Sequence, residues 1–150
     1  MKSIINKQAR FNYEILNRYE AGLVLRGYEV KSLKDGHANL RGAYISLKPT
    51  PKPELWLVKA HVSRYKCAGA MPNYDPERPR KLLIKKKELS SIIGKMEQKG
   101  LTLIPIKMYT IRNLVKLEFA LARGKKKYEK KADMKKKDVE TEIRRTLKYQ

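Results

Sequence analysis

Two histidines and one cysteine are the side chains that would carry catalytic or metal chemistry in this chain. His37 and His61 lie in different segments, and together with Cys67 they do not show a metal-ligand spacing. Cys67 has the basic neighbours Arg64 and Lys66, but a lone cysteine lacks the orienting partner of a catalytic pair. The glycines are too scattered for a phosphate loop. The sequence therefore predicts no enzyme, no metal and no cofactor.

Positive charge is the dominant property of the sequence. Its 150 residues include 36 Lys and Arg against 15 Asp and Glu, a formal net charge of +21. Such a surplus attracts polyanions, and nucleic acid is the expected partner, with affinity that falls as salt rises. No apolar stretch is long enough to span a membrane, and the first residues do not read as a secretory signal. We therefore expect no membrane partner and a cytoplasmic location.

Residues 124–150 form a basic tail. They contain eleven Lys and Arg against five Asp and Glu, and no glycine or proline after Gly124. Val139, Ile143 and Leu147 repeat at a spacing of four, which predicts a helix with a narrow apolar stripe. A stripe this narrow does not hold an isolated helix in water. We therefore expect a tail that is disordered when free and helical on an anionic partner.

Two further features suggest contact with nucleic acid. Cations at residues 78–81 and 85–87 flank the short apolar run of residues 82–84. The run itself favours a buried strand, with phosphate contacts at its two ends. Tyr128 stands among lysines, where an aromatic ring could stack on an unpaired base, worth ~1–3 kcal/mol. The sequence is equally consistent with Tyr128 being an exposed tyrosine that has no binding role.

Alternation of apolar and polar residues predicts several strands. Residues 11–25 form the clearest strand, with Glu20 on its polar face. The segment 101–110 also reads as a strand, and Pro105 favours a place at a sheet edge because proline lacks an N–H donor. The other expected elements are strands at 44–47, 55–62 and 115–121, helical turns at 29–34, an amphipathic helix at 86–99, and loops at 48–53 and 71–79.

These elements indicate a mainly β fold. The expected arrangement is an antiparallel β-barrel of the oligonucleotide-binding (OB) type over residues 1–123, with a few short helices and the basic C-terminal tail, 124–150. A split α+β sheet would satisfy the same order of elements.

Five blocks of sequence resemble one bacterial family. They are residues 6–9 (NKQA), 19–22 (YEAG), 27–34 (GYEVKSLK), 75–83 (DPERPRKLL) and 122–126 (ARGKK). In this order and at these spacings they are similar to small protein B, the family that binds transfer-messenger RNA (tmRNA), also called SsrA. The resemblance extends from about residue 6 to residue 137.

The resemblance implies an RNA-binding adaptor of trans-translation, the rescue of stalled ribosomes. An OB-type barrel would bind the tRNA-like domain of tmRNA, which elongation factor Tu delivers once the RNA carries alanine. The tail would become ordered in the decoding centre and the empty mRNA channel. A structural ribosomal or ribosome-assembly protein is the main alternative, and an RNA-modifying enzyme is a third.

The resemblance also implies site residues. Positions that bind RNA in the family match Asn6, Lys7, Glu20, Leu83 and Lys116, and the cations Arg80 and Lys81 in the fourth block join them. Glu20 would accept hydrogen bonds from bases or ribose, because a carboxylate does not pair with phosphate. Contacts with the ribosome are expected from Lys125, Lys126, Tyr128, Lys130, Lys131, Lys135, Lys136 and Leu147.

Overall fold

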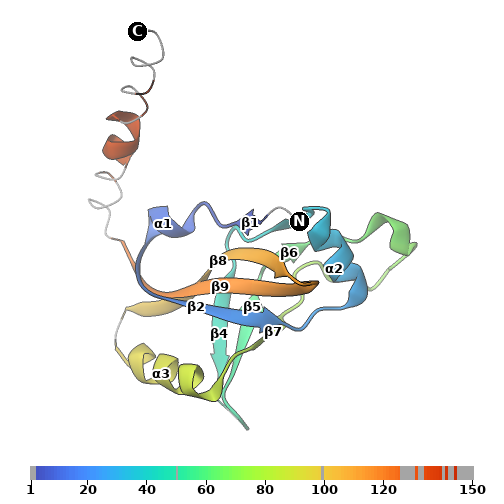
Figure 1. The fold of residues 1–150 in the computed structure, drawn as a ribbon, viewed down its shortest axis with the longest axis horizontal. Helices are drawn as coiled ribbons and strands as arrows, with labels where there is room; N and C mark the ends of the chain where they lie inside the picture. Colours follow the sequence, from blue (N-terminus) through green and yellow to red (C-terminus); the bar gives the residue numbers. More distant parts are fainter. Residues whose placement is uncertain are drawn as a thin grey trace.

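The fold is mainly β, with a seven-stranded antiparallel sheet in the order β1-β8-β4-β5-β7-β2-β9 and a small second sheet, β3-β6 (Figure 1). A computed structural model describes residues 3–49, 51–98 and 100–125, and residues 131, 134–139, 141 and 144 of the tail. The strands are β1 (Ile4–Ile5), β2 (Tyr13–Leu23), β3 (Ala38–Asn39), β4 (Tyr44–Lys48), β5 (Glu54–Val58), β6 (His61–Val62), β7 (Arg80–Leu83), β8 (Leu101–Ile111) and β9 (Leu114–Gly124).

Short helices connect the strands. They are α1 (Ala9–Asn12), α2 (Gly27–Lys34), the 3₁₀ turn η1 (Lys66–Ala68) and α3 (Lys86–Met96). The predicted helices at 29–34 and 86–99 are thus present, and Gly36 and Gly100 adopt the positive φ that glycine allows just beyond them. The single turn α1 was not predicted, because four residues are too few to show a helical period.

An additional pairing joins β8 to β9, so that β8, β4, β5, β7, β2 and β9 pair in a closed series. The antiparallel, mainly β character predicted from the sequence is confirmed. The OB type of barrel stays a prediction from the resemblance.

The strand predicted at 11–25 is confirmed over Tyr13–Leu23. Its exposure alternates along the chain: Arg18 and Glu20 are exposed, while Tyr19 is half-buried and Ala21 is buried. Glu20 therefore points outward, as the alternation predicted. The strand predicted at 55–62 is instead divided into β5 and β6, and Lys59, between them, has a φ of 61°.

The prediction of an edge position for 101–110 is wrong. Strand β8 pairs with β1, β4 and β9, so it lies inside the sheet. Pro105 is accommodated because the register with β9 shifts between Pro105 and Lys107. A bulge of this kind interrupts the ladder where proline has no N–H to donate.

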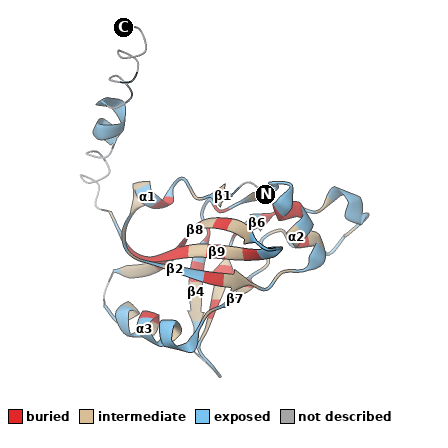
Figure 2. Ribbon diagram, in the orientation of Figure 1, coloured by how far each residue is buried: buried red, intermediate tan, exposed pale blue. Residues whose placement is uncertain are grey.

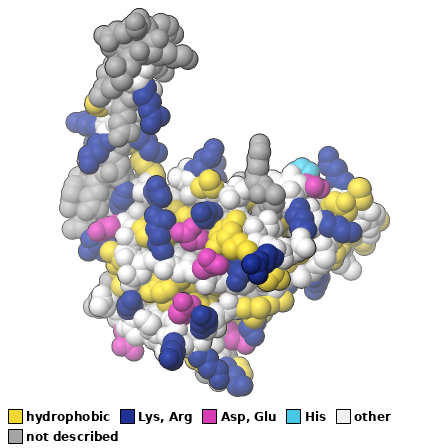
Figure 3. All heavy atoms as spheres, in the orientation of Figure 1, with side chains coloured by type: hydrophobic (Ala, Val, Ile, Leu, Met, Phe, Trp, Pro, Cys, Tyr) yellow, Lys and Arg dark blue, Asp and Glu magenta, His cyan; other side chains and the backbone are white. Residues whose placement is uncertain are grey.

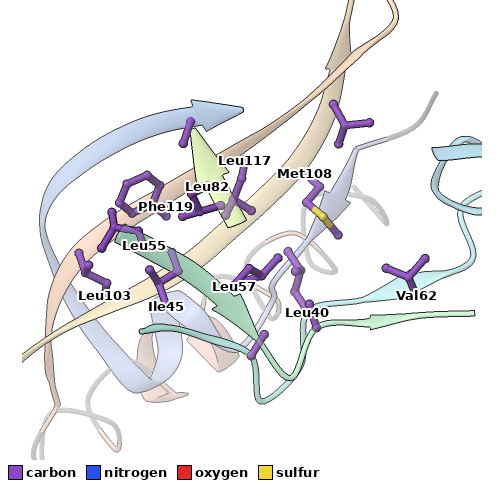
Figure 4. Close-up of a cluster of buried hydrophobic side chains, with 14 of the residues drawn as sticks. Leu40, Ile45, Leu55, Leu57, Val62, Leu82, Leu103, Met108, Leu117 and Phe119 are labelled. Atoms are coloured by element: carbon purple, nitrogen blue, oxygen red, sulfur yellow. The ribbon is translucent and has the colours of Figure 1, made fainter. Parts of the chain in front are cut away.

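The main core lies between the inward faces of the strands (Figure 4). Leu57, Leu103, Leu117 and Phe119 are fully buried there, and Ile92 packs α3 against the same cluster. Figure 2 shows that buried positions gather in the sheet, while much of α3 is exposed. A smaller apolar cluster lies under α1 and comprises Ala9, Ile104, Ile106, Ala120 and Ala122. It fixes the N-terminal segment to β8 and β9.

A buried ion pair fixes α2 to the start of β7. Arg80 Nε donates to Glu29 Oε2 at 2.5 Å, and both side chains are almost wholly buried. Arg78 also donates to Glu29, and the backbone N–H of Arg26 donates to Glu29 Oε1 at 3.0 Å. Burial alone would raise the pKa of Glu29, but these donors together lower it below its ordinary value.

The described tail residues, 131, 134–139, 141 and 144, are helical and exposed. None of the helices in the described part of the chain has the length and apolar character needed to cross a membrane.

Candidate nucleic-acid interface

The antiparallel register places two of the predicted RNA-binding residues, Leu83 and Lys116, in one row on the same face, on either side of Gly22. Gly22 on β2 is the partner of Leu83 on β7 and, on its other side, of Lys116 on β9. Lys116 in turn pairs with Tyr109 on β8. Because paired residues point to the same side of a sheet, Leu83, Lys116 and Tyr109 lie in one row across four strands.

The next row along the same face carries three charged side chains, and Arg18 reaches it from the adjacent row. Glu20 on β2 pairs with Glu118 on β9, which pairs with Lys107 on β8. Arg18 Nη1 lies 3.1 Å from Glu118 Oε1, and Lys107 Nζ lies 3.4 Å from Glu118 Oε2. Glu118 thus holds two cations in place. We call the two rows together, with Arg18, the sheet face: Arg18, Glu20, Gly22, Leu83, Lys107, Tyr109, Lys116 and Glu118.

Glu20 keeps much of its hydrogen-bonding capacity. Its side chain is half exposed, and its Oε1 lies 4.0 Å from Lys116 Nζ, a loose and solvated pair. Tyr109 is the other neighbour of Glu20. The pKa of Tyr109 is raised to about 12, first by burial, then by a hydrogen bond with Glu20, and then by the charges of Glu20 and Glu118. Tyr109 is therefore neutral at physiological pH, and the Glu20 carboxylate remains available to donors from outside.

Two hollows make this face continuous with the N-terminal segment. One, of about 580 Å³, is lined by residues that include Arg18, Glu20, Tyr109 and Glu118. The second, of about 310 Å³, is lined by Arg18 and Glu118 together with Lys7 and others. In Figure 3 the Lys and Arg side chains on the visible face surround a few acidic and apolar ones. Such a surface offers donors, acceptors and apolar contact side by side.

Asn6 is fixed beside the second hollow. Its backbone N–H donates to Ile106 O at 2.7 Å, and its Nδ2 donates to Pro105 O at 2.9 Å. Its Oδ1 is buried and has no hydrogen-bond partner among the described residues. Lys7, the next residue, is exposed.

The structure corrects the expectation for the apolar run 82–84. Leu82 is buried, whereas Leu83 is 56% exposed on the outward side of β7. The apolar run predicted burial for both leucines, because such a run does not show which face of a strand is dry. Gly22, the partner of Leu83, bears no side chain, and a Cβ at that position would lie 3.6 Å from Leu83 Cβ and 3.9 Å from its Cδ1, so the leucine packs over the glycine.

Arg80 and Lys81 lie elsewhere. Arg80 is 1% exposed, and besides its bond to Glu29 it donates to Ala60 O at 2.8 Å and Pro76 O at 3.0 Å. The prediction that Arg80 contacts RNA needs correction, because its donors are used inside the protein. Lys81 is partly exposed but forms an ion pair with Glu54 at 3.1 Å, on the side of β5. It lies at the margin of the sheet face.

Sequence reasoning missed four residues of the face. Arg18, Lys107, Tyr109 and Glu118 were not proposed as binding residues, although Arg18 and Glu118 stand on polar positions of correctly predicted strands. The sequence signal that Arg18 and Glu118 share a face with predicted RNA-binding residues was a spacing of two, between Arg18 and Glu20 and between Lys116 and Glu118. Which strands are neighbours was the missing information.

The predicted tail contacts are only partly described. Lys125 lies at the end of the sheet, where its backbone N–H donates to Asn12 O at 2.9 Å. Lys131, Lys135 and Lys136 are helical and exposed. Lys126, Tyr128, Lys130 and Leu147 lie outside the described residues.

The side chains considered for catalytic or metal chemistry were His37, His61 and Cys67. Within the described ranges there is no group of three or more His, Cys, Asp or Glu side chains that could hold a metal ion. His37 and His61 are both exposed, and Cys67 is a free, exposed thiol.

The fold and this face define a basic, mainly β protein with a mixed-charge sheet surface suited to nucleic acid. The family model described as "SmpB protein" matches residues 3–149, and the chain belongs to this family. It is 46% identical over 143 residues to an SsrA-binding protein from Trichodesmium erythraeum, covering 95% of this chain and 90% of the relative. It is likewise 46% identical to one from Thermosynechococcus vestitus, covering 95% and 92%.

A solved structure shows the same likeness. It is described as "tmRNA-SmpB: a journey to the center of the bacterial ribosome", and its chain is 44% identical to this one with a TM-score of 0.67. The match covers 83% of this chain and 85% of that chain. The fold is therefore shared with a protein whose description places it with tmRNA and the ribosome.

Proposed function

We propose that this protein binds the tRNA-like domain of tmRNA and brings it to stalled bacterial ribosomes as the adaptor of trans-translation. The observation that carries the proposal is the register of the sheet. It places Glu20, Leu83 and Lys116, which match RNA-binding positions of the family, on one outward face across three neighbouring strands. The names of the relatives, SsrA-binding proteins, and the membership in the SmpB family support it.

The side chains of the face divide the work of binding by their chemistry. Lys116, Lys107 and Arg18 suit phosphate oxygens, which position an RNA but do not read its sequence. Glu20 suits the amino groups of bases or ribose hydroxyls, the donors that an RNA offers. Leu83 offers apolar area to a base or a ribose. The protein acts here by binding, and no chemical step is assigned to it.

The tail has a separate task in this proposal. Its cations, Lys125, Lys131, Lys135 and Lys136 among the described residues, would contact ribosomal RNA in the decoding centre and the empty mRNA channel. Lys126, Tyr128, Lys130 and Leu147 belong to the same proposed contact. Delivery with elongation factor Tu and alanyl-tmRNA, and a bacterial cytoplasmic location, follow from the same adaptor role.

Truncation tests the proposed division of labour. Deletion of residues 126–150 retains Lys125, whose N–H bonds to Asn12, and so leaves the sheet intact. We expect this variant to bind the isolated tRNA-like domain with nearly the affinity of the full chain, and to lose peptide tagging on stalled ribosomes. Loss of RNA binding in the truncated protein, with its fold intact by circular dichroism, would place the RNA site in the tail and contradict the proposal.

A further inference from the structure

A third hollow adjoins the second one along the N-terminal segment and contains none of the sheet-face residues in its lining. Its volume is about 270 Å³, and its lining is Ile5, Asn6, Lys7, Gln8, Asn39 and Arg41. Asn6 and Lys7 also line the hollow that contains Arg18 and Lys107. The segment between β1 and α1 therefore lines both basic hollows. The two hollows share Ile5, Asn6 and Lys7 in their linings, so they adjoin along this segment between the sheet face and the loop after β3.

The loop that presents Arg41 is fixed in place. Asn39 pairs with His61 in the small sheet, and its Oδ1 accepts the backbone N–H of Arg41 at 2.8 Å. Leu40, between them, is 1% exposed and belongs to the main core. Gly42 follows with a φ of 77°, which turns the chain back into the sheet. Arg41 is thus an exposed cation on an anchored turn, which lowers the entropy cost of using it in binding.

The charges in this hollow are not compensated. Its lining contains Lys7 and Arg41 and no Asp or Glu. Within the described part of the chain, no ion pair involves either side chain, in contrast to Arg18 and Lys107, which share Glu118. Two cations with three side-chain amides offer many N–H donors and no fixed negative charge. A phosphodiester fits this set, because guanidinium and amide donors match phosphate oxygens.

We propose that the sugar–phosphate backbone of the bound RNA continues from the sheet face across residues 5–8, and that Arg41 and Lys7 bind a phosphodiester in this hollow. The inference rests on the proposed function, since it extends the surface that holds the same RNA. It adds Arg41 and Asn39, which no motif of the sequence singled out. Because Arg41 contacts only phosphate, it adds affinity and sets the path of the RNA without reading its bases.

The salt dependence of binding tests this assignment in the full-length protein. Each phosphate that a cation neutralises contributes about 0.7 to 0.9 to the slope of log affinity against log salt concentration. Arg41→Ala should lower the magnitude of that slope for the tRNA-like domain by about this amount. Lys52→Ala is the matched control, because Lys52 is an exposed cation in the loop between β4 and β5 and lines none of these hollows. It should leave the slope nearly unchanged.

Phosphate ethylation interference locates the contact. At least one phosphate whose ethylation weakens binding of the wild-type protein should lose that effect with Arg41→Ala and keep it with Lys52→Ala. If both variants retain the wild-type slope and interference pattern while the wild-type protein binds the RNA, Arg41 is not a phosphate contact, and the proposed function stands without it. Equal slope losses in Arg41→Ala and Lys52→Ala would show that both cations act only by long-range attraction of the RNA. That result would also overturn the inference. Failure of the wild-type protein to bind would remove both proposals together.

Discussion

Glu20 on β2 and Glu118 on β9 stand directly opposite each other on the outward face of the sheet. Like charges in this position are destabilising unless cations offset them. Lys116 lies beside Glu20, while Arg18 and Lys107 hold Glu118. The candidate interface is therefore a surface in which two adjacent carboxylates are surrounded by three cations. This pattern suits an RNA that is recognised by its donors as well as by its phosphates.

Lys116→Ala should separate binding from stability. The Lys116–Glu20 pair spans 4.0 Å between partly exposed side chains, so its loss should change the free energy of unfolding by no more than about 0.5 kcal/mol. Affinity for the tRNA-like domain should fall, and the salt slope should fall by about 0.7 to 0.9. Urea unfolding and RNA titrations at several salt concentrations measure the two effects. Lys116→Arg should retain most of the affinity, and equal loss in that variant would argue against a phosphate contact.

Leu82 and Leu83 provide a matched pair of substitutions on one strand. Leu82→Ala should cost roughly 2–5 kcal/mol of stability, because it removes a buried side chain from the core. Leu83→Ala should cost less than about 1 kcal/mol, because the side chain is 56% exposed, yet it should weaken RNA binding. Urea unfolding and RNA titration of both variants distinguish the roles. A Leu83→Ala protein with normal RNA affinity would exclude Leu83 from the interface.

The buried pair of Glu29 and Arg80 should control stability. Arg80→Ala leaves the Glu29 carboxylate buried with fewer donors, and we expect it to cost roughly 3–5 kcal/mol. Calorimetric or urea unfolding measures this loss. Because RNA binding through Arg80 is not expected, the folded fraction of the variant should bind RNA with nearly normal affinity. A stable Arg80→Ala protein with weak RNA binding would restore Arg80 to the interface.

The same pair predicts a dependence of stability on pH. The pKa of Glu29 is lowered in the folded protein from its ordinary value of 4.5. Its contribution to stability is therefore present above pH 4.5 and is lost as the pH falls through the lower, folded-state pKa. Urea unfolding across the acid range should show this loss in the wild-type protein. Glu29→Gln should remove part of the slope, and an unchanged slope would show that Glu29 is not the titrating group.

Tyr109 should ionise unusually late. Its pKa is raised from 10.0 to about 12 by burial and by its hydrogen bond with Glu20. The difference in tyrosinate absorbance between the wild-type protein and Tyr109→Phe, recorded rapidly after a jump to alkaline pH, should therefore rise near pH 12. The stability that this protonated state contributes is present below pH 10 and lost as the pH rises through the folded value. Ionisation of Tyr109 near pH 10 would contradict the burial of its hydroxyl and its hydrogen bond with Glu20.

Local pattern was sufficient to predict the strands but not their neighbours. The alternation in β2 and β9 placed Glu20 and Lys116 on polar faces correctly, because apolar and polar residues alternate along a strand that is buried on one face only. Pro105 misled the prediction, since a bulge can accommodate proline inside a sheet as well as at its edge. Whether Leu83 or Leu82 faces the core depends on partners that are distant in the sequence.

The role of Arg80 was hidden for the same reason. A basic run reads as a surface feature, and only the fold brings Glu29 close to Arg80, 51 residues away in the chain. The roles of Arg18 and Lys107 could likewise not be predicted from the sequence, because both side chains contact Glu118 across three strands. Interactions between strands decide the site, and local sequence does not show them.

The affinity of Glu20→Ala for the tRNA-like domain of tmRNA tests the central claim most directly, with Glu14→Ala as its control. Both substitutions remove one carboxylate that pairs with a β9 cation, Lys116 or Arg123, so they change the net charge equally. Only Glu20 lies on the sheet face. The account predicts a marked loss of affinity for Glu20→Ala, in spite of its higher positive charge, and normal or slightly tighter binding for Glu14→Ala. Full affinity in Glu20→Ala, or an equal loss in both variants, would contradict it.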